Sequence, residues 1–440
     1  MDAESNRKKW SLIAYILVLL TSRSYAEFEN NTHLAFNNEL NVETLVNLVQ
    51  DRNPGIEALS AIEEAANYQI VPAQSLDDPT FSYGFAPKTL DADNGRGLNQ
   101  KIELSQKIPW PGTLAAREEA ARQEVNVAHE DVNALRLQLV ALTKSAYAEW
   151  YFVDRAIEIH ASTRKLLEEL RSVAETRYAA GRTLQQDVLQ AEVEQRNLDR
   201  HGLELKRLKS SIQVKINTLL NLEPSSPLPS AADISIQESI PPLAVLEQRA
   251  IDLHPELKRI NAQVAANSAQ ITLAEKSFYP DLQLSAGYNS LWDAHDKRPI
   301  VGVSINLPLN HSKRKAALSK VKANERSLQM QLINQRAQLL GGLARTYAEA
   351  MESAHAVELY ESSLVPLANE YLSAALADYK SGAGSFLSVI TAEQKKLITE
   401  EALERNRANY FSQIAELERW AGGSLDEHFA FSAGVKYENK

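Results

Sequence analysis

The sequence predicts a mostly α-helical fold that also supplies strands to a membrane β-barrel, with one unit of helix, β-hairpin and long helix used twice. Three observations lead to this prediction. The stretches RYAAGRTLQQDVLQAE at 177–192 and DYKSGAGSFLSVITAE at 378–393 are similar and begin 201 positions apart. Four segments alternate apolar and polar residues, as strands with one buried face do. Long helical runs, about 112–178 and 311–378, follow the strands.

The similarity of the two stretches extends to other parts of the chain in the same order. Asn53-Pro54 falls on His254-Pro255 at the same spacing, and Tyr147-Ala148-Glu149 matches Tyr347-Ala348-Glu349 with a slip of one position. The period is too long for a solenoid repeat, so it indicates a duplicated, domain-sized unit. We predict a first repeat over 27–221, a linker over 222–242, a second repeat over 243–423 and a C-terminal tail over 424–440.

The N-terminus has the pattern of an export sequence. Arg7, Lys8 and Lys9 precede the apolar run WSLIAYILVLLTS, and Ser24-Tyr25-Ala26 has the small-x-small form of a cleavage site. We therefore predict a signal peptide over 1–26. An uncleaved membrane anchor is the alternative, although the run is shorter than the roughly 20 residues that a membrane-spanning helix needs.

Composition and motifs exclude several classes of function. The chain has no cysteine, hence no disulfide and no cysteine nucleophile, and its net charge of -10 argues against nucleic-acid binding. The metalloprotease, phosphate-loop, dinucleotide and nucleophile-elbow motifs are all missing from the sequence. We predict a protein that is not an enzyme, with no catalytic residue, no cofactor and no metal site.

Two β-hairpins are predicted, over 79–108 and 280–308. In the first, Phe81, Tyr83 and Phe85 share one face and polar residues the other, and the pattern recurs after the loop with Ile102 and Leu104. The second hairpin carries the same alternation over 282–288 and 301–307. Each strand has one face suited to lipid and one suited to water.

Four strands are too few to close a membrane barrel. Open strand edges are not tolerated in lipid, and the smallest membrane barrels have about eight strands. An oligomer must therefore complete the ring, and three chains would supply twelve strands. The strand count excludes a monomer more firmly than it selects a trimer.

The helical runs end in tight turns. The run over 112–178 has an apolar seam close to a heptad repeat, which predicts lengthwise packing on neighbouring helices. Gly181 is suited to the left-handed conformation that ends a helix. Thr183 and Gln186 have capping-box spacing, so they begin the next helix. Shorter helices are predicted over 55–77, 184–220, 256–278 and 385–420.

On these residues the chain resembles the TolC-like outer-membrane efflux channels. The resemblance covers roughly 40–423 and rests on the duplicated plan, on QKIPWPG at 106–112 and on the two similar turns. The Pro-Trp-Pro-Gly form is most similar to the heavy-metal-efflux branch. The resemblance implies a homotrimer in the outer membrane of a Gram-negative bacterium. It also implies a twelve-stranded barrel in outer-membrane lipid, a long periplasmic α-helical barrel, a periplasmic adaptor and an inner-membrane pump of the RND type.

The resemblance also implies roles for the residues at the turns. The turns would form the end of the channel that contacts the adaptor and acts as the gate. The alternative is that the two glycines only cap helices. The residues of this predicted tip are Tyr178, Gly181, Thr183, Leu184, Tyr379, Gly382, Ser385 and Phe386.

A constriction near the turns is a further expectation from the resemblance. Some relatives carry paired aspartates at the positions of Ser388 and Thr391, and this chain lacks both acids. Asp187 occupies the place of Ser388 in the first repeat, so three copies could favour cations by their field. The alternative is a solvated acid that the helix dipole stabilises.

Five aromatic residues are candidates for the membrane interfaces, with simple packing as the alternative for each. They are Phe81, Tyr83, Trp110, Tyr288 and Trp292. The function that follows is a passive exit duct for small molecules or metal cations. The alternatives are a soluble periplasmic coiled-coil scaffold or adaptor, and the same channel serving type I protein secretion.

Overall fold

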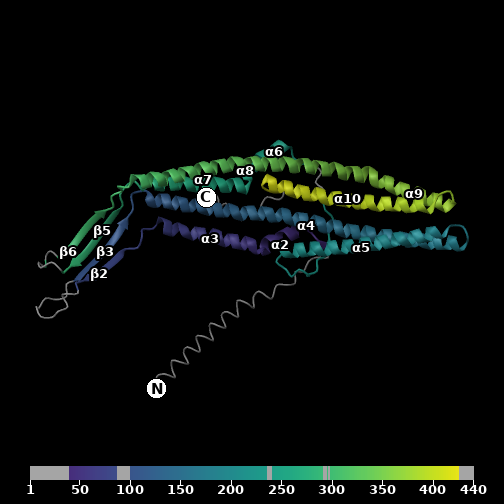
Figure 1. The fold of residues 1–440 in the computed structure, drawn as a ribbon, viewed down its shortest axis with the longest axis horizontal. Coiled ribbons are helices and arrows are strands. Elements are labelled where there is room, and N and C mark those ends of the chain that lie inside the picture. The colour runs from purple at the N-terminus through teal and green to yellow at the C-terminus, as the bar shows by residue number, and fades with distance from the viewer. Residues whose placement is uncertain (1–38, 87–99, 235–239, 291–294, 296–297, 426–440) are drawn as a thin grey trace, which may run out of the picture. The chain divides into compact units, whose positions relative to one another are not determined.

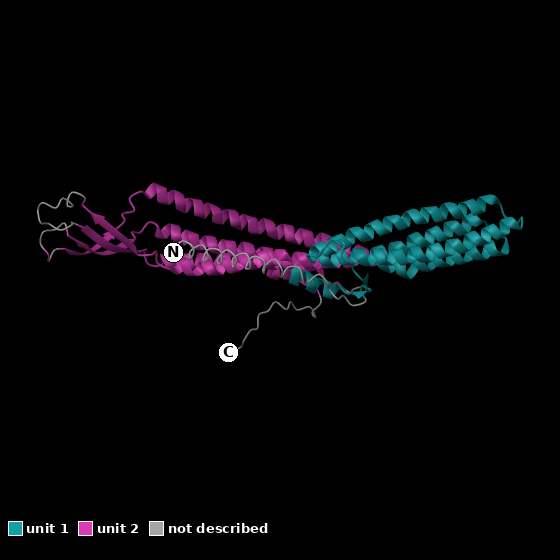
Figure 2. Cartoon of the chain, turned by 90° about the horizontal axis from the view of Figure 1, so that it is seen from below, with its two compact units in different colours: residues 1–52, 143–235, 357–409 teal, residues 53–142, 236–356, 410–440 magenta. Residues whose placement is uncertain are grey.

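The computed structural model describes residues 39–86, 100–234, 240–290, 295 and 298–425. The predicted signal peptide, Trp292 and the tail beyond residue 425 lie outside the described residues. The chain forms two compact units, each assembled from three separate stretches of sequence (Figure 2). Unit 1 comprises residues 1–52, 143–235 and 357–409, and unit 2 comprises residues 53–142, 236–356 and 410–440.

Unit 2 contains an antiparallel four-stranded sheet to which both repeats contribute (Figure 1). Phe81 lies opposite Leu104, Leu104 opposite Ala286, and Ala286 opposite Val301, so one apolar face crosses all four strands. The side chain of Phe81 is 65% exposed and that of Val301 is 86% exposed. The predicted alternation is confirmed. The strands are β2 (Thr80–Phe85), β3 (Gln100–Ile108), β5 (Leu282–Asn289) and β6 (Pro299–Ile305), in the order β2-β3-β5-β6.

The helices of unit 2 begin at equivalent positions of the two repeats. Asn53 caps α3 by accepting a hydrogen bond from the Gly55 amide (3.0 Å). His254 caps α7 in the same way, with Nδ1 accepting from the Glu256 amide (3.3 Å). The helices with residues in this unit include α3 (Pro54–Gln74), α4 (Thr113–Ala179), α6 (Leu243–Leu253), α7 (Pro255–Lys276), α8 (His311–Leu359) and α10 (Phe386–Ala421).

Acid is expected to destabilise unit 2 through His254. Its side chain is buried and its Nε2 has no hydrogen-bond partner among the described residues. Burial lowers the pKa of His254 to about 4, with Glu256 opposing the shift and Arg419 adding to it. The pKa of His254 in the folded protein lies below the value of 6.5 for a free imidazole. The neutral ring therefore contributes its full stabilisation of the folded state above pH 6.5. It is lost as the pH falls towards about 4, and the loss amounts to roughly 3 kcal/mol.

The measurement is the unfolding temperature between neutral and acidic pH for the natural chain and for His254→Asn. Asparagine keeps a capping oxygen, as Asn53 does in the first repeat, and removes the titration. The variant is expected to lose less stability on acidification. Equal pH slopes for the two proteins would contradict this account.

Unit 1 is a bundle in which four helices pack lengthwise (Figure 1). Its core combines residues from both repeats, including Leu167, Leu198, Leu372 and Ile390. Leucine and isoleucine at helical spacing form such a seam. The helices with residues in this unit include α2 (Val42–Arg52), the C-terminal part of α4, α5 (Gln185–Leu219), α9 (Val365–Ser381) and α10.

The two predicted long helices differ. Helix α4 is continuous, in agreement with the prediction over 112–178. The run predicted over 311–378 is also helical throughout, but a π-helical turn, η4 (Tyr360–Leu364), separates α8 from α9. Pro366 has no amide hydrogen to donate, and the Val365 amide reaches back to the Tyr360 carbonyl in a wider turn.

The segment after the first repeat is fastened to α4, and we call residues 229–233 the strap. Strand β4 (Ser230–Ala231) of the strap pairs in parallel with β1 (Glu39–Leu40). The Trp150 indole donates a hydrogen bond to the Pro229 carbonyl (2.9 Å), and the Tyr147 hydroxyl lies 2.8 Å from the Ala232 carbonyl. These two side chains lie one turn apart on the same face of α4.

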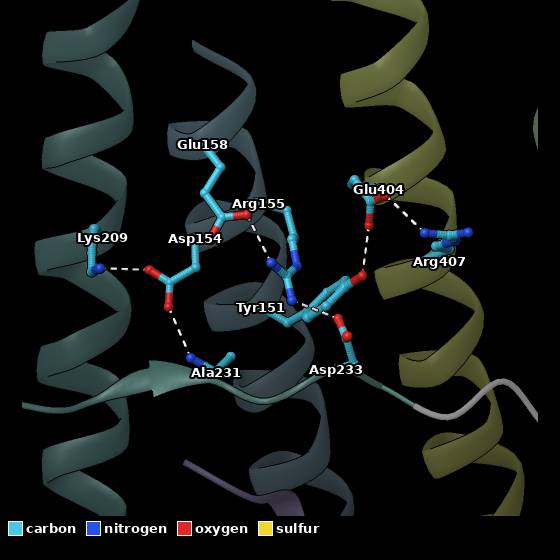
Figure 3. A network of polar contacts seen from close by, with 9 residues as sticks. All are labelled: Tyr151, Asp154, Arg155, Glu158, Lys209, Ala231, Asp233, Glu404 and Arg407. Carbon is cyan, nitrogen blue, oxygen red and sulfur yellow. Dashed lines mark hydrogen bonds and ion pairs between the residues drawn. The ribbon is translucent and has the colours of Figure 1, made fainter. Parts of the chain in front are cut away.

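Charged groups continue the strap contacts across unit 1 (Figure 3). Asp154 is buried and accepts hydrogen bonds from the Ala231 amide (2.9 Å) and from Lys209 of α5. Arg155 binds Asp233 and Glu158. On the opposite side of the network, Tyr151 of α4 donates to Glu404 of α10 (2.7 Å), which also accepts from Arg407 (2.9 Å). Burial, together with Glu404, raises the pKa of Tyr151 to about 12.

In the part of the chain that the structure describes, no helix combines the length and the apolar character required of a membrane span.

Candidate functional site

The candidate site is the pair of helical turns at one end of unit 1, which joins α4 to α5 and α9 to α10 (Figure 1). In the first turn Gly181 adopts a φ of 65°, as predicted. Its amide donates to the Tyr178 carbonyl (2.9 Å), and the Arg182 amide donates to the Arg177 carbonyl (2.8 Å). This pattern is the Schellman motif, in which glycine avoids the steric penalty of a left-handed residue.

The second turn repeats the first. Gly382 has a φ of 83° and its amide donates to the Tyr379 carbonyl (3.2 Å). The Ala383 amide donates to the Asp378 carbonyl (3.0 Å). The duplicated sequence therefore produces the same backbone hydrogen bonds twice.

The starts of the following helices differ between the repeats. The predicted capping role of Thr183 was wrong, since α5 begins after Leu184, which makes no side-chain cap. The Thr183 hydroxyl instead donates to the Asp187 carboxylate, four residues further on. In the second turn Ser385 does cap its helix, because its hydroxyl accepts from the Ser388 amide (3.2 Å).

Arg177 joins the two turns. Its Nη1 donates to the Tyr379 carbonyl (2.9 Å) and its Nη2 to the Lys380 carbonyl (3.2 Å). The guanidinium carbon also lies 4.3 Å from the centre of the Tyr379 ring. A cation at the last carbonyls of α9 satisfies acceptors that the helix leaves unpaired and complements its dipole. We call this set of contacts the Arg177 tie.

Two of the predicted tip residues lie in the core. Tyr379 is 4% exposed and Phe386 is 1% exposed, and their rings meet edge to face at 5.5 Å. Burial raises the pKa of Tyr379, while the charge of Arg177 opposes this shift. These side chains hold the turns in place and are not part of the surface of the unit.

Other residues of the predicted tip are on the surface. Leu184 is 64% exposed and Tyr178 is 46% exposed, and the nearby Leu387 of α10 is 57% exposed. The glycines and Ser385 are exposed as well. Apolar side chains gathered at exposed turns are typical of a protein contact surface.

The predicted constriction residues lie on two helices. Asp187 is in the first turn of α5, half-buried and bonded to Thr183. Ser388 and Thr391 are exposed and one turn apart on α10. In the described part of the chain no hydrogen bond joins Asp187 to either of them.

The predicted interface aromatics divide into two groups. Phe81, Tyr83 and Tyr288 lie on the sheet with partly or largely exposed rings. Trp110 stacks on Tyr279 at 4.9 Å, which favours packing at the junction of strand and helix for this residue.

Arg177 was not singled out from the sequence. Its partners lie 202 and 203 positions away, so local spacing carries no information about the contact. Within the described residues, no group of three or more His, Asp or Glu side chains is placed to hold a metal ion.

Comparison with known proteins agrees with this geometry. The family model for outer membrane efflux proteins matches residues 45–222 and 246–423. The chain is 23% identical over 397 residues to nodulation protein T of Rhizobium leguminosarum bv. trifolii, covering 81% of this chain and 80% of that protein. It is 22% identical over 358 residues to the toluene efflux pump outer membrane protein TtgF of Pseudomonas putida, covering 74% of this chain and 69% of that protein.

A solved structure with the same fold is that of the outer membrane protein VceC of Vibrio cholerae. It matches with a TM-score of 0.71 at 20% identity, covering 88% of this chain and 97% of that one. The two stretches that the family model matches make up well over half of the chain. The chain therefore belongs to the outer membrane efflux protein family.

Proposed function

We propose that the chain is the exit duct of a tripartite efflux system, in which three copies close a twelve-stranded barrel and an α-helical tunnel. The observation that carries the proposal is the exposed apolar face that crosses all four strands of the sheet. Strands β2 and β6 form the edges of this sheet. Exposed edges and an apolar face require a partner and lipid, and further copies of the chain supply the partner strands.

The second part of the proposal concerns the turns. A periplasmic adaptor docks on the exposed apolar residues Tyr178, Leu184 and Leu387, and an inner-membrane pump of the RND type supplies the energy. The Arg177 tie holds the turns together in the closed state, and docking separates them. Small molecules or metal cations then diffuse through a water-filled tunnel. TtgF, which is named for a toluene efflux pump, supports export of small molecules.

The experiment that tests the proposal is chemical crosslinking of the mature protein, purified from outer membranes in detergent, combined with conductance in planar bilayers. A conducting trimer is the expected result. A monomer that remains soluble without detergent would overturn the proposal and favour a periplasmic scaffold or adaptor. The neighbouring genes distinguish type I protein secretion from efflux. In the case of secretion they would encode a secreted protein and its transporter.

Asp187 is expected to favour cations in the open channel. Three copies of its carboxylate lie near the end of the tunnel in the proposed trimer, and their field raises the local cation concentration. Asp187→Asn should reduce the cation preference, measured as the reversal potential across a salt gradient. Asp199→Asn is the matched control, because Asp199 lies further along α5 in an ion pair with Arg196 (3.1 Å). An unchanged preference in Asp187→Asn would remove this residue from the constriction.

A further inference from the structure

Helices α4, α5 and α10 of unit 1 line a partly open pocket of about 170 Å³. Its apolar walls are formed by Leu167, Leu198, Ile390 and Leu397. An engineered apolar cavity of about 150 Å³ holds a benzene molecule. The pocket therefore has room for one small ring or a short alkyl chain.

A buried acid, Glu393 of α10, lines this pocket. Its side chain is 2% exposed, and neither carboxylate oxygen has a hydrogen-bond partner among the described residues. The hydroxyl of Thr163, another lining residue, is buried beside this carboxyl but makes no hydrogen bond of normal geometry with a described residue. A charged carboxylate buried in this way is strongly unfavourable unless it forms an ion pair with a cation or accepts a hydrogen bond.

Burial accordingly raises the pKa of Glu393. On its own helix Lys396 lowers the pKa and Glu400 raises it, and Thr163 of α4 lowers it. From α5 the pocket is lined by the charged or titratable groups of Glu194, Arg200 and His201. A cation placed beside this carboxyl would favour its ionised form and offset the effect of burial on its pKa.

Glu194 of α5 is a second acid in the pocket wall, and it forms no ion pair or hydrogen bond with a described residue. The cationic lining groups are already engaged. Arg200 binds Glu204, and His201 Nε2 lies 2.8 Å from a carboxylate oxygen of Glu401. The pocket lining therefore includes two acids that form no ion pair with a described residue.

The equivalent positions of the first repeat show what differs around Glu393. Its equivalent in the first repeat is Glu192, which is exposed and lies 3.5 Å from Arg171. At the same spacing the second repeat has Leu372 in place of Arg171. The second repeat thus has the same acid in a buried position, with an apolar residue at the position of the cation.

We propose that this pocket binds a small organic monocation, with its ammonium group at Glu393 and Glu194 and its apolar body against the leucine walls. A metal ion is a poor fit for this pocket, because apolar walls offer no ligand atoms to replace the water molecules that the ion loses. The described residues also include no cluster of metal-binding side chains. An ammonium group on a short apolar body matches both features of the site. The inference goes beyond the exit duct and does not depend on it.

The test uses isothermal titration calorimetry of the full-length protein in detergent at neutral pH, with benzylammonium and benzyl alcohol as probes. The two probes have similar shape and differ in charge. Benzylammonium is expected to bind about tenfold more tightly or better, because charged hydrogen bonds are stronger than neutral ones. Glu393→Gln should bring this ratio close to one. Glu192→Gln, at the equivalent position of the first repeat, should leave it unchanged.

Equal binding of the two probes by the natural chain would overturn the proposal, as would an unchanged ratio in Glu393→Gln. A second variant, Leu397→Trp, fills the pocket from its wall and should abolish binding of both probes. Binding that survives this substitution would place the probes elsewhere and would also overturn the proposal. None of these readouts involves conductance, so failure here is distinguishable from failure of the exit-duct proposal.

Discussion

Replacing Arg177 with alanine is expected to raise the conductance of the channel in planar bilayers. The substitution removes both hydrogen bonds to the end of α9 and the contact with the Tyr379 ring. Charged hydrogen bonds and a cation–π contact that are partly exposed contribute about 2 kcal/mol together. That loss changes the ratio of tied to untied turns about 30-fold in each protomer.

Arg182→Ala is the control for this experiment. Arg182 is exposed, belongs to the same turn and carries the same charge, but it contributes only backbone contacts to the described residues. Its removal should alter the local potential without opening the channel. Equal conductance changes in the two variants would show that charge, and not the tie, controls the turns. No change in either variant would contradict the gating role of Arg177.

Replacing Trp150 with alanine is expected to cause the largest loss of stability among single substitutions in unit 1. The side chain is 1% exposed, donates to the strap at Pro229 and has the Lys209 ammonium 4.8 Å from its ring centre. Truncating a buried tryptophan costs about 3–5 kcal/mol, because it leaves a cavity. Thermal unfolding in detergent, followed by circular dichroism, measures the loss.

Trp150→Phe separates packing from hydrogen bonding. It keeps most of the buried ring and leaves the Pro229 carbonyl without its donor, at a cost of about 1–3 kcal/mol. Both variants should also speed proteolysis of the segment after residue 221, since the strap is released from α4. Natural stability in Trp150→Ala would show that the strap contributes nothing to the fold of unit 1.

The sequence was sufficient for features that local spacing controls. Alternation specified the strands and their shared apolar face, as the pairing of Phe81, Leu104, Ala286 and Val301 shows. Glycine specified both left-handed turns. In each case the physical cause lies within a few residues, in side-chain direction along a strand or in the missing Cβ of glycine.

Contacts between distant segments could not be predicted in this way. The strap depends on two-residue strands that pair across the whole first repeat, and the Arg177 tie depends on which helices become neighbours. The burial of Glu393 depends on helix packing, whereas its equivalent, Glu192, is exposed. Pro366 can be read in the sequence, but local spacing does not show the wider turn that accommodates its missing donor.

The π-helical turn gives the two hairpins different mechanical properties. Helix α4 enters the first turn as a continuous rod, with an unbroken set of backbone hydrogen bonds. The second hairpin is reached through η4 and Pro366, where one donor is missing and the turn is wider. We therefore expect a force applied equally to both turns to bend the second hairpin first, at η4. The two repeats would then differ in stiffness although they share one helical plan.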